Sequence, residues 1–125
     1  MINYRTVNGS FDLSGKTAIV IGGGGGIGGT TAEMYAGKGA NIAVVDCKDN
    51  VEDVAIELAA KYGVKTIGLR CDVTIQTEVE NIVSKVVDTF GEINILANMP
   101  GYVELERASS IDIDVIERHI AINAV

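Results

Sequence analysis

The sequence predicts an α/β fold built around a parallel sheet, and two observations support this prediction. Short apolar runs alternate with longer amphipathic segments along the chain, and glycine or polar residues separate them. This alternation is typical of parallel strands joined by crossover helices. All but one of the predicted strands are apolar almost throughout, which indicates that helices cover both faces of the sheet.

Four strands follow from the apolar runs, at residues 17–21, 41–46, 64–70 and 93–97. Crossover connections are right-handed, and a reversal of strand order is needed to open a ligand crevice. Together these rules predict the spatial order 3-2-1-4 for the sheet. We expect the first and second helices on one face, and the third and last on the other.

The first two helices are predicted from their ends. The first begins inside the glycine run at residues 22–26 and ends near residues 38–39. The second runs from residue 49 or 50 to residue 62, and Gly63 follows it as a C-terminal stop.

The third and fourth helices are predicted from apolar residues at three- and four-residue spacing. Thr74 is placed to cap the N-terminus of the third helix, and Gly91 follows that helix as a stop. The fourth covers residues 111–125, where the single histidine, His119, is expected to be a solvated residue. Residues 1–10 are predicted to form a loose N-terminal arm, which leaves residues 11–125 as one domain.

The composition argues against several classes of partner. The formal net charge is −7 and the pI is near 4.5, and no basic run interrupts the acidic surface, so we expect neither nucleic acid nor anionic lipid as a partner. The apolar runs are too short to cross a bilayer, which predicts a cytoplasmic protein with no membrane partner. Cys47 and Cys71 lack the spacing of metal ligands, so we expect reduced thiols and no metal site.

Five consecutive glycines, residues 22–26, separate the first strand from the first helix. Without Cβ atoms, backbone N–H groups can approach a pyrophosphate, and the positive end of the helix points toward it. A tight turn without a ligand is the alternative, but a strand before and a helix after favour dinucleotide binding. Two spacings fit: G-x-G-x-x-G from Gly23 or Gly24, and the narrower Gly22-x-x-x-Gly26-x-Gly28.

Asp46 ends the second strand, eighteen residues after Gly28. A carboxylate at this position can accept hydrogen bonds from the adenosine ribose, and it repels a 2′-phosphate. The sequence therefore favours NAD over NADP, although Lys48 lies close by. The alternative is that Asp46 is an ordinary turn residue.

Three segments follow one another in the order and spacing of the short-chain dehydrogenase/reductase family: FDLSGKTAIVIGGGGGIG, CDVT and NILANMPG. The chain resembles the N-terminal, cofactor-binding half of such an enzyme over residues 11–125. The resemblance implies a Rossmann-type doubly wound parallel sheet, truncated after the fourth helix. The family loop T-G-x-x-x-G-x-G falls on Ile21, Gly22, Gly26 and Gly28, and so selects the narrower glycine spacing.

The resemblance also implies cofactor-binding and catalytic roles for individual residues. The residues that would position the dinucleotide are Gly22, Gly26, Ile27, Gly28, Asp46, Asp72, Val73 and Asn98. Among them, Asp72 and Val73 would hold the adenine, and Asn98 would lie beside a cofactor ribose. From the residues alone, an N-capping role for Asp72 ahead of Thr74 explains it equally well. Asn123 matches the family's catalytic helix asparagine, which supports a proton relay to the catalytic lysine; otherwise it is simply an Asn in a helix.

The implied function is an NAD(H)-dependent oxidoreductase acting on a small-molecule secondary alcohol or carbonyl, and a homo-oligomer in its full-length form. The family's catalytic serine and Y-x-x-x-K pair have no counterpart in these residues, so the 125-residue chain is expected to be inactive by itself. The alternative is a catalytically inactive dinucleotide-binding or interaction module.

The chain departs from the family at two neighbouring positions. Ile21 replaces the family's threonine, and N-N-A-G becomes Asn98-Met99-Pro100-Gly101. In the family that threonine forms a hydrogen bond toward the N-N-A-G segment. We expect Ile21 and Met99 to occupy the same space here through an apolar contact, because removing both partners of a buried polar pair can be nearly neutral.

Overall fold

The structure is a computed structural model, and it describes residues 11–124. The predicted N-terminal arm, residues 1–10, lies outside the described residues. The elements in chain order are β1 (Thr17–Ile21), α1 (Gly26–Gly37), β2 (Asn41–Asp46), α2 (Val51–Tyr62), β3 (Thr66–Arg70), α3 (Gln76–Phe90), β4 (Ile95–Asn98) and α4 (Ile113–Asn123).

The four strands form one parallel sheet in the order β3-β2-β1-β4, which confirms the predicted fold class. The strand β1 lies between β2 and β4, so that Ile21 at its end is level with Val45 and with Asn98. Strand order reverses at β1, and a ligand crevice in such a sheet opens at the carboxyl ends of the strands beside this reversal.

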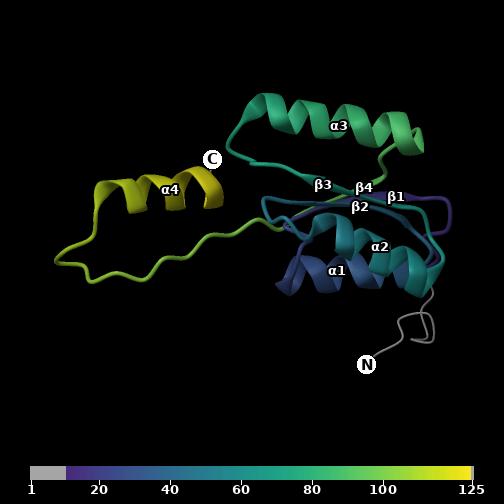
Figure 1. The fold of residues 1–125 in the computed structure, drawn as a ribbon, viewed down its shortest axis with the longest axis horizontal. Helices are drawn as coiled ribbons and strands as arrows, with labels where there is room; N and C mark the ends of the chain where they lie inside the picture. The colour runs from purple at the N-terminus through teal and green to yellow at the C-terminus, as the bar shows by residue number, and fades with distance from the viewer. Residues whose placement is uncertain (1–10, 125) are drawn as a thin grey trace.

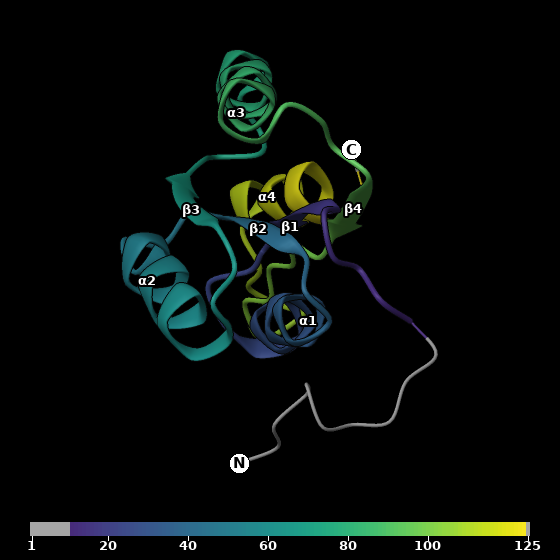
Figure 2. The same ribbon diagram turned by 90° about the vertical axis from the view of Figure 1, so that its right-hand side faces the viewer.

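Helices cover both faces of the sheet, with α1 and α2 on one side and α3 on the other (Figures 1 and 2). The strands alternate accordingly, because successive side chains in a strand point to opposite faces. Ala18 and Val20 of β1 pack with the α1 and α2 layer, whereas Ile19 packs with the α3 layer. Fully buried Ala32 and Ala36 let α1 approach the sheet closely.

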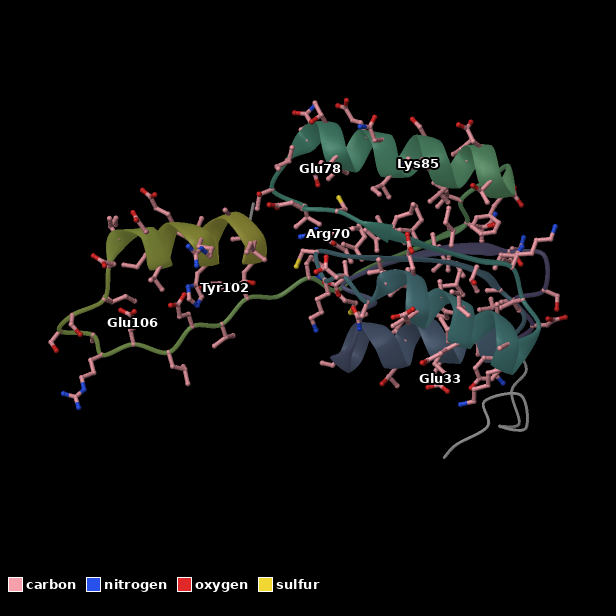
Figure 3. All side chains as sticks on the ribbon, in the orientation of Figure 1. Glu33, Arg70, Glu78, Lys85, Tyr102 and Glu106 are labelled. Atoms are coloured by element: carbon pink, nitrogen blue, oxygen red, sulfur yellow. The ribbon has the colours of Figure 1, made fainter. Side chains whose placement is uncertain are left out.

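A polar cluster joins α1 to α2. The buried Tyr62 donates a hydrogen bond from its hydroxyl to Glu33 Oε1 at 2.9 Å, and Lys61 binds the same oxygen. The hydrogen bond from Lys61 holds the pKa of Glu33 below its usual range, and burial raises the pKa of Tyr62. The cluster therefore fixes α1 and α2 to each other. Figure 3 labels Glu33 beside these two helices.

The helix α4 corrects one prediction, since it does not cover the sheet beside α3. It lies beyond the carboxyl ends of the strands, at the far end of the connection formed by residues 99–112 (Figure 1). Val115 is the only buried residue of α4. The side chains of Asn123 and His119 in α4 form hydrogen bonds with the connecting segment. An amphipathic pattern identifies a helix but not the surface that the helix meets.

The predicted element ends are partly correct. Gly63 and Gly91 end α2 and α3 with positive φ of 69° and 87°, as expected of glycine stops. The prediction of Thr74 as an N-cap is wrong, because α3 begins at Gln76 and the Thr74 hydroxyl binds Asp72 Oδ1.

The third and fourth strands begin two residues later than predicted, and asparagine side chains add hydrogen bonds beside the backbone bonds at both starts. The Asn41 side chain accepts the N–H of Lys65 just before β3, and the Asn94 side chain accepts the N–H of Thr17 just before β4. Within residues 11–124, no helix has the length and apolar character needed to cross a bilayer.

Candidate functional site

A cleft of about 340 Å³ lies at the carboxyl edge of the sheet. Its walls come from the last residues of β1 and β2, from the segments that directly follow β3 and β4, from the start of α1 and from one residue of α4. The lining residues are Ile21, Gly22, Gly25, Ile27, Gly28, Asp46, Cys47, Lys48, Cys71, Asp72, Val73, Met99, Pro100, Gly101 and Ile122. The cleft therefore occupies the place where a doubly wound sheet binds its ligand.

The turn from β1 into α1 is so tight that a Cβ would clash with the backbone at several of its glycines, most severely at Gly28 and Gly22. A Cβ on Gly28 would lie 2.0 Å from the carbonyl oxygen of Gly22, and a Cβ on Gly22 would lie 2.7 Å from that of Met99. Gly22 also has φ of 80°. The first turn of α1 contains no acidic side chain, so its positive end faces the cleft without a carboxylate of its own helix.

Asp46 reaches from the end of β2 to the glycine loop. Its Oδ2 accepts the N–H of Gly24 at 3.0 Å, and the side chain of Asn50 donates to the carbonyl oxygen of Gly24 at 2.9 Å. The Lys48 ammonium lies 3.5 Å from the position that a Cβ would take on Gly25. One carboxylate and one ammonium thus flank the loop on the side of β2.

Asp72 and Val73 form the wall beyond β3. Oδ1 of Asp72 accepts the N–H of Thr74 at 2.9 Å and its hydroxyl at 2.6 Å, and these bonds hold the pKa of Asp72 below its usual range. The N–H of Asp72 donates to Glu78 Oε2 at 2.7 Å. Asp72 therefore stabilises the turn before α3, without being the cap of that helix.

Six of the eight residues expected to position a dinucleotide line the cleft, namely Gly22, Ile27, Gly28, Asp46, Asp72 and Val73. Gly26 and Asn98 do not line it. Gly26 is the exposed first residue of α1, with φ of 58°, and Asn98 ends β4 beside the lining residue Met99.

Asn123 lies outside the cleft wall, although the neighbouring Ile122 is part of it. The side-chain amide of Asn123 accepts the N–H of Tyr102 and donates to the carbonyl oxygen of Tyr102, both at 2.9 Å. Figure 3 shows Tyr102 between α4 and the segment that leads to it. Asn123 thus ties α4 to the chain directly after the cleft residue Gly101.

His119 is not the solvated residue that the sequence predicts. It is half-buried, with Nδ1–H donating to the carbonyl oxygen of Val115 at 2.7 Å and Nε2 accepting the N–H of Glu104 at 3.1 Å. Its ring also meets that of Tyr102 edge to face, with the centroids 4.8 Å apart. These contacts give His119 a structural role in holding α4 against the segment before it.

The expected contact between Ile21 and Met99 is also wrong. Ile21 packs on the α3 side of the sheet, while Met99 lines an apolar groove on the α1 side with Met34 and Ile95. The strand partner of Ile21 is Asn98, and a step of one residue along a strand reverses the face of the side chain. The Met99 N–H donates to the Ile21 carbonyl oxygen at 2.9 Å, but the two side chains lie on opposite faces of the sheet, so an apolar contact between them does not replace the family's hydrogen-bonded pair.

Sequence reasoning missed several of the lining residues, including Cys47 and Cys71. Cys47 lies between Asp46 and Lys48, both of which the sequence indicated, so its position in the chain could have indicated it as well. Burial raises the pKa of both cysteine thiols. Among residues 11–124 no group of three or more His, Cys, Asp or Glu side chains could hold a metal ion.

Comparisons with known proteins agree with this geometry. Residues 16–125 match the family described as short chain dehydrogenase. The D-threitol dehydrogenase of Mycolicibacterium smegmatis is 36% identical over 119 residues, which are 94% of this chain and 45% of that protein. The NAD-dependent glycerol dehydrogenase of Listeria innocua is 29% identical over 122 residues, which are 98% of this chain and 47% of that protein.

A solved structure of a short-chain type dehydrogenase/reductase from Mycobacterium marinum superposes with a TM-score of 0.82 and is 32% identical. The match covers 88% of this chain and 43% of that one, so the chain spans about half the length of the relatives that it matches. Since the family match extends over nearly all of the described residues, the chain belongs to the short chain dehydrogenase family.

Proposed function

We propose that residues 11–125 are the dinucleotide-binding domain of an NAD(H)-dependent oxidoreductase. The substrate would be a small-molecule secondary alcohol or carbonyl compound, and the full-length protein a cytoplasmic homo-oligomer. The observation that carries this proposal is the cleft itself, in which a glycine turn that excludes side chains faces the Asp46 carboxylate.

The residues present fit a dinucleotide. Because Gly22 and Gly28 leave no room for a Cβ, the start of α1 packs directly against the end of β1. Gly25, Ile27 and Gly28 line the cleft, and the first N–H groups of a helix have no acceptor within the helix. This arrangement suits a pyrophosphate, whose negative charge favours the positive end of α1.

The other proposed contacts with the dinucleotide lie at different places along the cleft. Asp46 would accept hydrogen bonds from the adenosine ribose, and Asp72 and Val73 would flank the adenine. Gly26, as part of the same turn, and Asn98, at the end of β4, would contribute at the pyrophosphate and at a ribose. Relatives named NAD-dependent glycerol dehydrogenase and D-threitol dehydrogenase support a polar alcohol as the type of substrate.

A bound nicotinamide supplies the hydride chemistry for oxidation of an alcohol or reduction of a carbonyl. The residues described here would bind the dinucleotide and orient it. Asn123 holds the backbone of Tyr102, the residue directly after the lining residue Gly101, so we assign Asn123 a positioning role in the proposed reaction.

Calorimetric titration of this chain with NAD and with NADP tests the proposal. We expect NAD to bind about tenfold more tightly or better, because each charge-assisted hydrogen bond to Asp46 contributes about 1.5–3 kcal/mol. In the Asp46→Asn variant this preference should fall by about tenfold, whereas Asp53→Asn, on the exposed side of α2, should leave it unchanged.

Two results would count against the proposal in different ways. Equal affinity for the two cofactors, or a preference for NADP, would refute the role of Asp46. Failure of the folded chain to bind either dinucleotide would refute the cofactor-binding function.

A further inference from the structure

The peptide of Gly24 is held on both sides by residues outside the glycine loop. Its N–H donates to Asp46 Oδ2 at 3.0 Å, and its carbonyl oxygen accepts from Asn50 Nδ2 at 2.9 Å. Gly24 is buried, and the two partners come from the end of β2 and the start of α2. The loop is therefore connected to the only carboxylate that we assign to the adenosine ribose.

Asn50 occupies the N-cap position of α2, yet its side chain makes no capping hydrogen bond. An asparagine at this position ordinarily accepts an N–H group of its own helix. Here the side-chain amide donates across to Gly24, so its bond serves the glycine loop and not the helix that it precedes.

The three groups are packed closely enough to restrict one another. A Cβ on Gly24 would lie 2.9 Å from Asp46 Oδ2 and 3.1 Å from Asn50 Oδ1. With Oδ2 bound to Gly24, the other carboxylate oxygen, Oδ1, accepts the N–H of Lys48 at a long 3.4 Å, and the Cys47 thiol interacts with the same carboxylate. The orientation of the carboxylate is thus set by the Gly24 peptide, and Oδ1 keeps capacity for another donor.

We infer that Asn50 is a positioning residue that determines cofactor specificity. By fixing the Gly24 peptide, it holds the Asp46 carboxylate in the orientation that receives the ribose hydroxyls of NAD and opposes a 2′-phosphate. This inference rests on the proposed function, because it concerns how the same cleft selects its dinucleotide.

Two variants test the inference by the ratio of the NADP and NAD dissociation constants. Asn50→Leu removes the donor at nearly constant size and at an exposed position. Gly24→Ala pushes the carboxylate and the amide apart, at a glycine that does not have positive φ. We expect each variant to lower the ratio about three- to tenfold, mostly through weaker NAD binding.

Two matched controls accompany these variants. Asn81→Leu changes an exposed asparagine on α3, and Gly29→Ala adds a Cβ that would meet only an ordinary contact at 3.6 Å. Both should keep the ratio of the wild-type chain, and thermal unfolding should show that Asn50→Leu folds as the controls do. If Gly24→Ala does not fold, the ratio of dissociation constants measured for Asn50→Leu alone tests the inference.

The outcomes separate this inference from the proposed function. If both variants weaken NAD and NADP equally, the ratio is unchanged, the role of Asn50 is merely structural, and the inference is wrong although the function stands. If the wild-type chain binds no dinucleotide, the proposed function fails at the first titration, and the inference fails with it.

Discussion

Gly28 shows how a single residue shapes the cleft. A Cβ at this position would lie 2.0 Å from the carbonyl oxygen of Gly22, and a backbone atom cannot move aside as the end of a flexible side chain can. We therefore expect Gly28→Ala to lower the free energy of unfolding by about 1–3 kcal/mol, the usual range of overpacked core positions, and to abolish dinucleotide binding.

Gly29→Ala is the matched control for this prediction. The added Cβ would lie 3.6 Å from the carbonyl oxygen of Gly23, and alanine stabilises a helix interior by about 1 kcal/mol relative to glycine. Chemical denaturation of both variants, followed by titration with NAD, is the measurement. Similar stabilities for the two variants would contradict the packing argument at Gly28.

Sequence reasoning at this scale succeeds where a residue acts through its own backbone or through a fixed spacing. The family loop pattern, which falls on Gly22 and Gly28, and the position of Asp46 at a strand end indicated three residues that line the cleft. It fails where the outcome depends on a neighbour distant in the chain. Nothing near Asn50 indicates that its amide reaches Gly24, twenty-six residues earlier.

Among the elements, α4 depends on polar contacts more than on burial. Val115 is its only buried residue, and the two hydrogen bonds of Asn123 to the backbone of Tyr102 hold its C-terminal end. We expect Asn123→Ala to increase hydrogen exchange of the α4 amides about tenfold to a hundredfold, because two net hydrogen bonds are worth about 1–3 kcal/mol.

The midpoint of global unfolding should change little in Asn123→Ala, since the sheet and its two helix layers do not depend on α4. Glu117→Ala, at an exposed position of α4, should leave the exchange rates of the helix unchanged. If Asn123→Ala leaves the exchange of α4 unchanged as well, the amide does not hold this helix in place.

The ends of the elements differ in how well sequence predicts them. Gly63 and Gly91 were correctly predicted as stops because a left-handed glycine is a local signal. The start of α3 was not, because Asp72 and Thr74 form hydrogen bonds with each other before the helix begins. The place of α4 could not be predicted, since an apolar periodicity does not say which surface receives it.

For the whole molecule, strand order was predictable because right-handed crossovers leave few topologies for alternating strands and helices. The order β3-β2-β1-β4 brings the carboxyl ends of the four strands, far apart in the chain, to one edge. The cleft at this edge is thus a consequence of topology. The faces on which Ile21 and Met99 lie depend instead on the exact strand register, because a shift of one residue moves a side chain to the opposite face.

The same cleft predicts what this 125-residue chain does by itself. Among its described lining residues there is neither a tyrosine nor a histidine, and burial raises the pKa of the two cysteine thiols, which makes them poor bases near neutral pH. A positioned acid–base group contributes about 10²–10⁴-fold to the rate of such reactions. We therefore expect the chain to bind NAD without measurable turnover.

Nicotinamide absorbance, followed with a panel of secondary alcohols and ketones, measures this turnover. The related D-threitol dehydrogenase of Mycolicibacterium smegmatis, assayed with D-threitol, is the positive control. Binding of NAD must be established for the same preparation, because an unfolded chain would also be inactive. Turnover by the 125-residue chain would mean that Asp46, Lys48 or Asp72 transfers the proton, since these are the remaining titratable side chains among the described residues that line the cleft. That result would contradict the expectation that this chain binds the dinucleotide without an acid–base group for the reaction.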